Sequence, residues 1–151
     1  MQIRPMHYQD LPEVFSISQK QFGAHSWQLG MFEQELEASG HYSFVIVEND
    51  AVVSFISYML TEGERGQEYN VLNIATAPGY ENNGYATALL EFLKQNAIDN
   101  NYAGLWLEVR ESNVNAIRFY TKFGFKVSYV RKKYYSNGEN AIIMEFLVPS
   151  P

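Results

Sequence analysis

The sequence predicts a single domain of the mixed α/β (α+β) class over residues 1–151. The first observation behind this prediction is the order of the periodic segments, in which a strand, two helices and a run of strands precede alternating helices and strands. The second is the length, which is sufficient for one domain to bury a substantial core. The third is the composition, with 46% hydrophobic and 19% charged residues, which is ordinary for a globular chain.

The first part of the chain predicts a short strand, two helices and a hairpin. The opening residues lead into a helix that Asp10 is placed to cap. A second helix is predicted over residues 27–38. The segments 42–47 and 51–60 are rich in β-branched and aromatic residues, and the polar tripeptide between them is a hairpin signal.

The middle of the chain predicts a strand, a sharp turn and a helix. Residues 62–67 are expected to form a polar loop, and residues 71–76 a strand. Residues 77–84 contain Pro and Gly and predict a turn, and residues 85–98 follow as a helix. Its apolar stripe at helical spacing consists of Ala88, Leu89, Phe92, Leu93 and Ala97.

A strand and a capped helix follow. Leucine and valine alternate with other residues over 105–109, the period that places successive side chains on opposite faces of a sheet. The next helix is predicted over residues 113–122, with Ser112 or Asn113 as its cap and Gly124 at its left-handed end.

The last two predicted elements are antiparallel strands. They cover residues 127–134 and 141–148, and a turn over residues 136–139 joins them. This turn contains the dipeptide Asn-Gly, which is a strong hairpin signal.

Charge and composition narrow the classes of function. The net charge of −6 disfavours a protein that coats nucleic acid, because such proteins carry a basic face. The chain has no cysteine, which excludes disulfides, thiolate metal sites and an acyl-cysteine intermediate. His7, His25 and His41 lack ligand-like spacing, so no metal site is expected.

The sequence also predicts a cytoplasmic protein with neither a nucleic acid nor a membrane as partner. The first ten residues lack the basic start and apolar run of a signal peptide. The longest apolar run, residues 51–60, is far shorter than the roughly 20 residues that a membrane helix needs.

Glu108 and Tyr120 lie on neighbouring predicted elements and are candidates for a base and an acid. A carboxylate and a phenol can take and give protons at a reacting group. An ordinary structural role is open for each of them. Glu108 would be solvated or would pair with Arg110 or Arg118, and Tyr120 would be a packed aromatic residue with a satisfied hydroxyl.

The turn at residues 82–86, Asn-Asn-Gly-Tyr-Ala, is a candidate phosphate site. Exposed amides at a helix N-terminus attract phosphate, and Gly84 and Ala86 would let a pyrophosphate approach the backbone. Ordinary turns use the same residue types. No Gly-Lys-Ser/Thr follows, so the segment is not a P-loop, and the dinucleotide glycine fingerprint is absent as well.

In combination these segments resemble the GNAT superfamily of N-acetyltransferases, and within it the RimI-type ribosomal-protein-alanine N-acetyltransferases. The resemblance spans nearly the whole chain and is strongest in three blocks, LNIATAPGYENNGYATALLEFL, LWLEVRESNVNAIRFYTKFGF and RKKYYSNGENAIIM. It implies the GNAT acyltransferase fold, a mostly antiparallel central sheet with flanking helices. The resemblance also implies one pair of parallel strands that splay apart, in which the strand of Glu108 diverges from the strand at residues 71–76.

The resemblance further implies acetyl-CoA as cosubstrate, without a metal, and assigns site residues. Glu108 matches the family's general base and Tyr120 its general acid. Residues matching cofactor contacts are Ile74, Ala75 and Thr76 along the pantetheine arm, Asn82, Asn83, Gly84, Tyr85, Ala86 and Thr87 at the phosphates, and Asn113. Residues matching the peptide-binding wall are Trp27, which equally fits a core position, Tyr134 and Tyr135.

The implied reaction is direct acetyl transfer to a primary amine, with the N-terminal alanine of a ribosomal small-subunit protein as the expected acceptor. A small amine or a lysine side chain is the alternative acceptor, and a non-catalytic acetyl-CoA-binding module is the alternative function. One departure concerns the phosphate turn, where Glu81 occupies a position that usually holds Gln or Arg. A carboxylate there would repel a pyrophosphate unless it points away or is paired.

Overall fold

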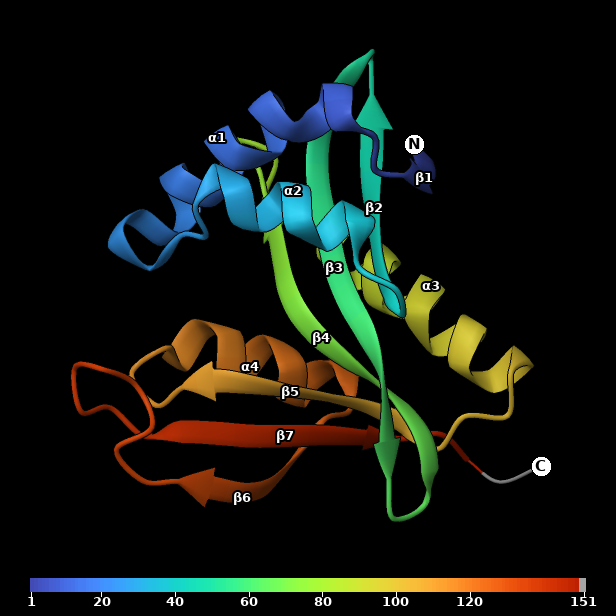
Figure 1. Cartoon of the computed structure of the whole chain (residues 1–151), viewed down its shortest axis with the longest axis vertical. Coiled ribbons are helices and arrows are strands. Elements are labelled where there is room, and N and C mark those ends of the chain that lie inside the picture. Colours follow the sequence, from blue (N-terminus) through green and yellow to red (C-terminus); the bar gives the residue numbers. More distant parts are fainter. Residues whose placement is uncertain (150–151) are drawn as a thin grey trace. The chain divides into compact units, whose positions relative to one another are not determined.

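The computed structural model describes residues 1–149, which form seven strands, four α-helices and two short 3-10 helices. The strands are β1 (Gln2–Pro5), β2 (His41–Glu48), β3 (Ala51–Gly63), β4 (Gly66–Thr76), β5 (Gly104–Arg110), β6 (Lys126–Arg131) and β7 (Ala141–Leu147). The helices are η1 (Tyr8–Asp10), α1 (Leu11–Phe22), η2 (Gly23–His25), α2 (Leu29–Glu37), α3 (Tyr85–Asp99) and α4 (Val114–Phe123). This is the mixed α/β class that the sequence predicts (Figure 1).

Two compact units share these elements. Unit 1 comprises residues 1–59 and 72–93, and unit 2 comprises residues 60–71 and the chain from residue 94 onward. Strands are ordered β1-β2-β3-β4 in unit 1 and β3-β4-β5-β7-β6 in unit 2. The pair β4 and β5 is parallel, whereas β1–β2, β2–β3, β5–β7 and β6–β7 are antiparallel. A single domain over the whole chain stays a prediction.

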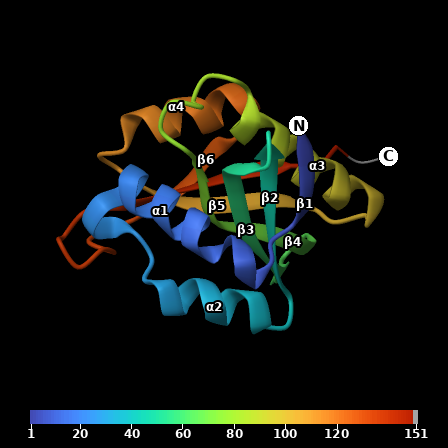
Figure 2. The ribbon, with the colours of Figure 1, turned by 90° about the horizontal axis from the view of Figure 1, so that it is seen from above.

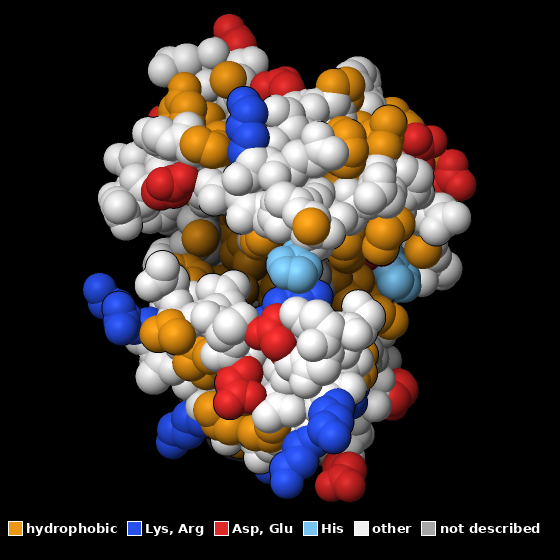
Figure 3. All heavy atoms as spheres, turned by 90° about the vertical axis from the view of Figure 1, so that its left-hand side faces the viewer, with side chains coloured by type: hydrophobic (Ala, Val, Ile, Leu, Met, Phe, Trp, Pro, Cys, Tyr) orange, Lys and Arg blue, Asp and Glu red, His pale blue; other side chains and the backbone are white. Residues whose placement is uncertain are grey.

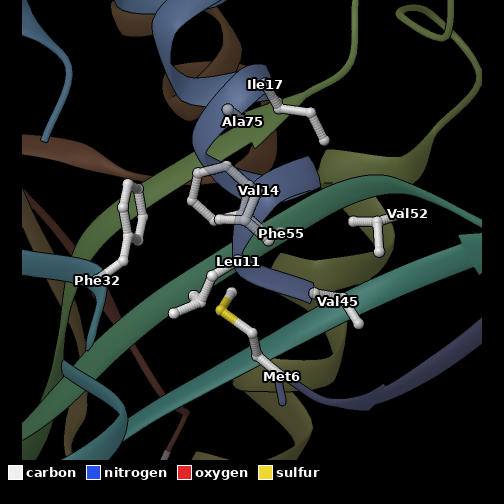
Figure 4. Packing of buried hydrophobic residues seen from close by; sticks show 9 residues of the cluster. All are labelled: Met6, Leu11, Val14, Ile17, Phe32, Val45, Val52, Phe55 and Ala75. Carbon is white, nitrogen blue, oxygen red and sulfur yellow. The ribbon is translucent and has the colours of Figure 1, made fainter. Parts of the chain in front are cut away.

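In unit 1, helices cover both faces of the strands. Figure 2 shows α1 and α2 on one side of β2 and β3, with α3 on the other. The first side holds a cluster of buried apolar side chains, which Figure 4 draws: Met6, Leu11, Val14, Ile17, Phe32, Val45, Val52, Phe55 and Ala75. On the opposite face, Phe44 of β2 packs on Phe92 of α3 with 4.7 Å between ring centroids. Because successive side chains point to opposite faces, Val45 packs toward α1 and α2 and Phe44 packs on α3.

In unit 2, α4 packs on one face of β5 and β7. Leu105, Leu107 and Val109 of β5 are buried, and Leu105 lies opposite Phe146 of β7. The Phe146 ring contacts Phe123 of α4 at 5.6 Å between centroids. Because side chains alternate along a strand, Trp106, Glu108 and Arg110 share the other face of β5, which we call the open face of unit 2.

Three structural expectations need correction. The predicted loop 62–67 is only a tight connection at Glu64 and Arg65, because β3 runs to Gly63 and β4 starts at Gly66. A strand tolerates polar residues when one of its faces is open, so the polarity of this segment was misleading. The predicted strand 127–134 ends at Arg131, because Lys133 has a left-handed φ of 52°.

The third correction concerns Asp10, which precedes α1 without capping it through its side chain. Its carboxylate oxygens are already engaged. One accepts a hydrogen bond from the His7 amide at 2.7 Å, and both accept hydrogen bonds from the Arg4 guanidinium at 2.7 and 2.8 Å.

The helices of the described chain are too short or too polar to span a membrane, and charges of both signs lie on the surface. No helix in residues 1–149 has an apolar stretch long enough to cross a bilayer. Figure 3 shows one face of the molecule, on which acidic and basic side chains are interspersed. This face therefore presents no extended field of a single sign.

Candidate functional site

The candidate phosphate turn of unit 1 offers a row of unpaired amides. Asn82 and Gly84 adopt left-handed φ angles of 62° and 81°, which turn the chain sharply into α3. The first helical hydrogen bond here runs from the Ala88 amide to the Gly84 carbonyl at 2.9 Å. Within residues 1–149, the backbone N–H groups of residues 82–87 donate to no acceptor. Successive free amides at the start of a long helix are the kind of donors that bind anions in proteins, and α3 has 15 residues. A phosphate site at this turn stays a prediction.

The strand that leads to this turn also has an unused edge. The parallel register of β4 with β5 begins at Glu68 and ends at Val71. Beyond it, Ile74, Ala75 and Thr76 form the last residues of β4. The Ala75 carbonyl accepts a hydrogen bond from the Ser54 hydroxyl at 2.8 Å, which ties this segment to β3. The end of the register at Val71 agrees with the splayed strand pair that the resemblance implies.

Glu81 is held by a neutral amide from α1. The Gln21 side-chain amide donates to the Thr76 carbonyl at 2.6 Å and to the Glu81 carboxylate at 2.8 Å. No cation pairs with Glu81 in the described chain, so the amide of Gln21 is the partner of a carboxyl group that directly precedes the unpaired amides. Gln21 therefore fixes the end of β4 and the start of the turn together.

Tyr85 and Trp27, the remaining candidates of unit 1, are both engaged with neighbouring side chains. The Tyr85 hydroxyl donates to Glu48 at 3.2 Å, and burial raises its pKa. Trp27 precedes α2 and packs on Phe32 at 5.1 Å between ring centroids, beside the apolar cluster. Trp27 is partly buried, and its contact with an acceptor peptide stays a prediction. Asn82, Asn83, Ala86 and Thr87 lie in the turn and the first turn of α3.

In unit 2, Glu108 lies on the open face with an arginine beside it. Its partner across the ladder is Ile143 of β7. The Glu108 carboxylate is 23% exposed and lies 3.5 Å from a guanidinium nitrogen of Arg131. The ion pair is thus with β6, and neither Arg110 nor Arg118, which the sequence suggested, is its partner in the described chain.

Tyr120 combines a buried ring with a free hydroxyl. The ring packs on Phe119 and Phe125 with centroid distances of 5.4 and 5.5 Å, and burial strongly raises the pKa of the phenol. Its hydroxyl forms no hydrogen bond within residues 1–149, and no buried polar side-chain atom there lacks a partner. The hydroxyl oxygen is therefore not completely buried. The packed ring was expected, whereas the satisfied hydroxyl was not found.

Asn113 caps α4 with its side chain. The carbonyl oxygen of the side chain accepts a hydrogen bond from the Ala116 amide at 3.2 Å. The sequence named Ser112 or Asn113, and the structure selects Asn113. Gly124 ends the helix at a φ of 126°, as predicted. The side-chain NH₂ of Asn113 stays available for a ligand, because no protein group of the described chain accepts from it.

Tyr134 and Tyr135 lie in the loop after β6 and are held by two arginines. Their rings meet edge to face at 5.2 Å between centroids. The Arg110 guanidinium lies 3.8 Å from the Tyr135 ring centroid, and Arg131 lies 5.4 Å from that of Tyr134. Burial raises the pKa of Tyr135, and the charge of Glu108 adds to this effect. The structure thus brings Glu108, Tyr134 and Tyr135 together through their arginines.

Sequence reasoning missed the two arginines as a pair and the carboxylate that anchors one of them. Arg110 binds Glu139 at 3.3 Å, and hydrogen bonds led by that of Ser112 lower the pKa of Glu139 to about 2. Arg110 follows Glu108 by two positions on one strand, so the period of two placed it on the same face. No comparable signal pointed to Arg131, because its face depends on how β6 pairs with β7.

A cavity of about 440 Å³ opens on the same face of unit 2. Ile143 and Arg131 line it near Glu108, and Trp106 lines it farther along β5. The Trp106 indole donates to the Thr61 hydroxyl at 3.0 Å. The charged residues that line the cavity are Glu62, Glu64, Glu68, Glu145, Arg65 and Arg131.

Comparison with known proteins gives consistent matches. The model of the Acetyltransferase (GNAT) family matches residues 8–125. The [ribosomal protein bS18]-alanine N-acetyltransferase of Escherichia coli (strain K12) is 33% identical over 139 residues, covering 89% of each chain. An N-alpha-acetyltransferase of Saccharolobus solfataricus is 34% identical over 122 residues, covering 75% of this chain and 73% of that protein.

Solved structures agree with these matches. The crystal structure of the ribosomal-protein-S18-alanine N-acetyltransferase from Escherichia coli superposes with a TM-score of 0.82 at 31% identity. It covers 99% of this chain and 95% of that one. The Ard1 structure from Thermoplasma volcanium gives a TM-score of 0.83 at 25% identity, covering 99% and 98% of the two chains.

Proposed function

Because the chain belongs to the GNAT family of acetyltransferases, we propose that it moves the acetyl group of acetyl-CoA to the N-terminal alanine of a ribosomal small-subunit protein. We propose one catalytic domain over residues 1–151, working in the cytoplasm where such an acceptor is made. The 33% sequence identity to the bS18-alanine N-acetyltransferase, which extends over 89% of both chains, supports this choice of acceptor.

The row of unpaired amides at residues 82–87 is the observation that carries the acetyl-CoA part of the proposal. Donors without a protein acceptor, placed at the positive end of a helix, suit the pyrophosphate of coenzyme A. Ile74, Ala75 and Thr76 would contact the pantetheine arm, and Asn113 would add a side-chain donor. Acetyl-CoA supplies an acetyl group activated as a thioester.

Glu108 acts in this proposal as the general base. An N-terminal amine has a pKa of about 8, so most of it is protonated near neutral pH and cannot attack a carbonyl. The Glu108 carboxylate, directly or through water, takes a proton from the ammonium and leaves the neutral nucleophile. Its 23% exposure leaves room for an acceptor or a water to reach it.

Tyr120 acts as the general acid. Burial of its ring raises its pKa, so the phenol stays protonated throughout the neutral range. Its hydroxyl has no partner in residues 1–149 and is free to give its proton to the departing thiolate. Trp27, Tyr134 and Tyr135 would then form walls for the acceptor peptide. The packing of Trp27 on Phe32 makes it a fixed surface, not a mobile one.

A test compares acceptors for release of free coenzyme A. The protein and acetyl-CoA are incubated with a basic peptide that begins with alanine, the same peptide blocked at its N-terminus, and a panel of polyamines and lysine derivatives. We expect turnover on the free peptide alone, with the new acetyl group on its N-terminus by mass spectrometry. Turnover on small amines only would contradict the acceptor, and binding of acetyl-CoA without any turnover would contradict the enzymatic function.

A further inference from the structure

Arg131 contacts the candidate base Glu108 and two nearby tyrosines, Tyr129 and Tyr134. One guanidinium nitrogen lies 3.5 Å from the Glu108 carboxylate, and the other donates to the Tyr129 hydroxyl at 3.1 Å. The same guanidinium lies 5.4 Å from the centroid of the Tyr134 ring. A planar fork of donors is well suited to hold several groups in one geometry.

An irregularity in β6 is what directs Arg131 to this face. Val127 pairs with Met144, but Tyr129 pairs with Ile143, so the intervening Ser128 is an extra residue in the ladder. Glu108 also pairs with Ile143, and Arg110 and Arg131 both pair with Ala141. The extra residue therefore places Tyr129 and Arg131 on the face of Glu108. Bulges that re-aim a side chain are common beside active sites.

The other cation near Glu108 is Arg110, and its guanidinium already contacts other side chains. Arg110 lies on the same strand and face, but it binds Glu139 at 3.3 Å and stacks on Tyr135 at 3.8 Å. The titratable groups of unit 2 that face Glu108 are thus Arg110 on β5, Tyr129 and Arg131 on β6, and Tyr134 and Tyr135 in the following loop. Only Arg131 forms an ion pair with the carboxylate among the residues described.

We propose that Arg131 is a positioning residue that holds the Glu108 carboxylate in the orientation in which it takes the proton of the acceptor. This inference deepens the proposed function and rests on it. Arg131 acts through Glu108 and does not itself contact the reacting atoms. Small displacements of a catalytic group are costly, since about 1 Å can lower a rate by about 10².

The charge of Arg131 predicts a distinctive kinetic result. Without the guanidinium, the carboxylate keeps its attraction for a cationic acceptor but loses its fixed orientation. In Arg131→Gln we therefore expect kcat to fall about tenfold while the KM for the peptide is unchanged or lower. A role limited to building the peptide wall would instead raise KM. Arg131→Lys keeps the charge without the fork and should recover part of kcat.

Lys132→Gln is the matched control, because it removes the same charge one position along and the exposed Lys132 side chain forms no hydrogen bond, ion pair or ring contact in residues 1–149. It should have wild-type kinetics. All variants are compared with the wild type on the alanine peptide, after thermal unfolding has shown that each is folded.

The outcomes separate the two proposals. A wild-type enzyme that acetylates no amine would overturn the proposed function and this inference with it. An active wild type with unchanged kcat in Arg131→Gln, a rise in KM alone, or an equal loss in Lys132→Gln would overturn the role of Arg131 and leave the function intact. If Arg131→Gln does not fold, the kcat of Arg131→Lys decides, and a wild-type value would contradict the inference.

Discussion

At the scale of single residues, the two proposed proton carriers differ in surroundings. Glu108 is partly exposed and ion-paired, whereas Tyr120 is 9% exposed. Partial exposure lets the Glu108 carboxylate exchange protons, and burial keeps the Tyr120 phenol protonated at neutral pH until a thiolate forms beside it.

Replacing Glu108 by Gln should lower kcat by about 10² to 10⁴ near neutral pH, because the base is lost and the acceptor amine stays protonated. The deficit should shrink as the pH rises above the amine pKa of about 8. The pH profile of kcat would show this, and calorimetry should show unchanged acetyl-CoA affinity. Wild-type rates at every pH would remove Glu108 as the base.

Tyr120→Phe deletes one oxygen that has no partner in the described chain. We therefore expect a fall in kcat of about 10² with a change in the free energy of unfolding below about 0.5 kcal/mol. Steady-state kinetics and urea unfolding would be measured on the same preparation. Equal kcat would return Tyr120 to a packing role, and a large loss of stability would reveal a partner for its hydroxyl.

At the scale of elements, the proposed phosphate site at the start of α3 would set the affinity for coenzyme A. The six unpaired amides of residues 82–87 attract an anion, but the Glu81 carboxylate lies beside them with only an amide partner. Glu81→Gln keeps an acceptor for Gln21 and removes the charge. Coenzyme A should then bind about fivefold more tightly, a gain of about 1 kcal/mol.

Calorimetric titration with coenzyme A measures this gain without turnover. Glu33→Gln, an exposed change of the same charge on α2, is the control and should leave the affinity unaltered. Equal affinity in Glu81→Gln and the wild type would mean that the carboxylate is screened from the ligand.

Local signals predicted the four α-helices and both ends of α4, whereas the side-chain cap predicted at Asp10 was wrong. The pairing register of the strands explains most of the other differences. Asn113 accepts a hydrogen bond through its side chain from the amide three residues on, and Gly124 has a left-handed φ. Both roles depend only on neighbours in the chain, so they could be predicted from the sequence. The faces of Tyr129 and Arg131 depend on an extra residue in the ladder, which only the pairing with β7 defines. The short connection at Glu64 was mispredicted as a longer loop, because the polar residues around it belong to strands with one open face.

At the scale of the molecule, Arg4 and Asp10 link β1 to the start of α1. Asp10 is 6% exposed, and the hydrogen bond and charge of Arg4 lower its pKa. The folded protein thus binds a proton on this carboxyl less tightly than the unfolded chain does. The resulting stabilisation is complete above the ordinary Asp pKa of about 4 and is lost as the pH falls through the lowered value.

Asp10→Asn should therefore reduce the free energy of unfolding at pH 7 by about 2 kcal/mol and flatten its dependence on pH below about 4. Urea unfolding at a series of pH values provides the measurement. Asp50→Asn loses the same charge at a hairpin turn whose φ of 63° suits asparagine, and it should behave as the wild type. A similar loss in both variants would assign the effect to net charge.

The extra residue at Ser128 has a consequence for how such a site changes over time. In a regular ladder, Ser128 and Val130 would occupy the face that now carries Tyr129 and Arg131. The same amino acids in the same order would then place the uncharged Ser128 and Val130 on the face of Glu108 in place of Tyr129 and Arg131. Which side chains of the edge strand β6 lie beside Glu108 thus depends on whether the strand carries this bulge. Gaining or losing one bulge would therefore change the groups around the proposed base without any substitution.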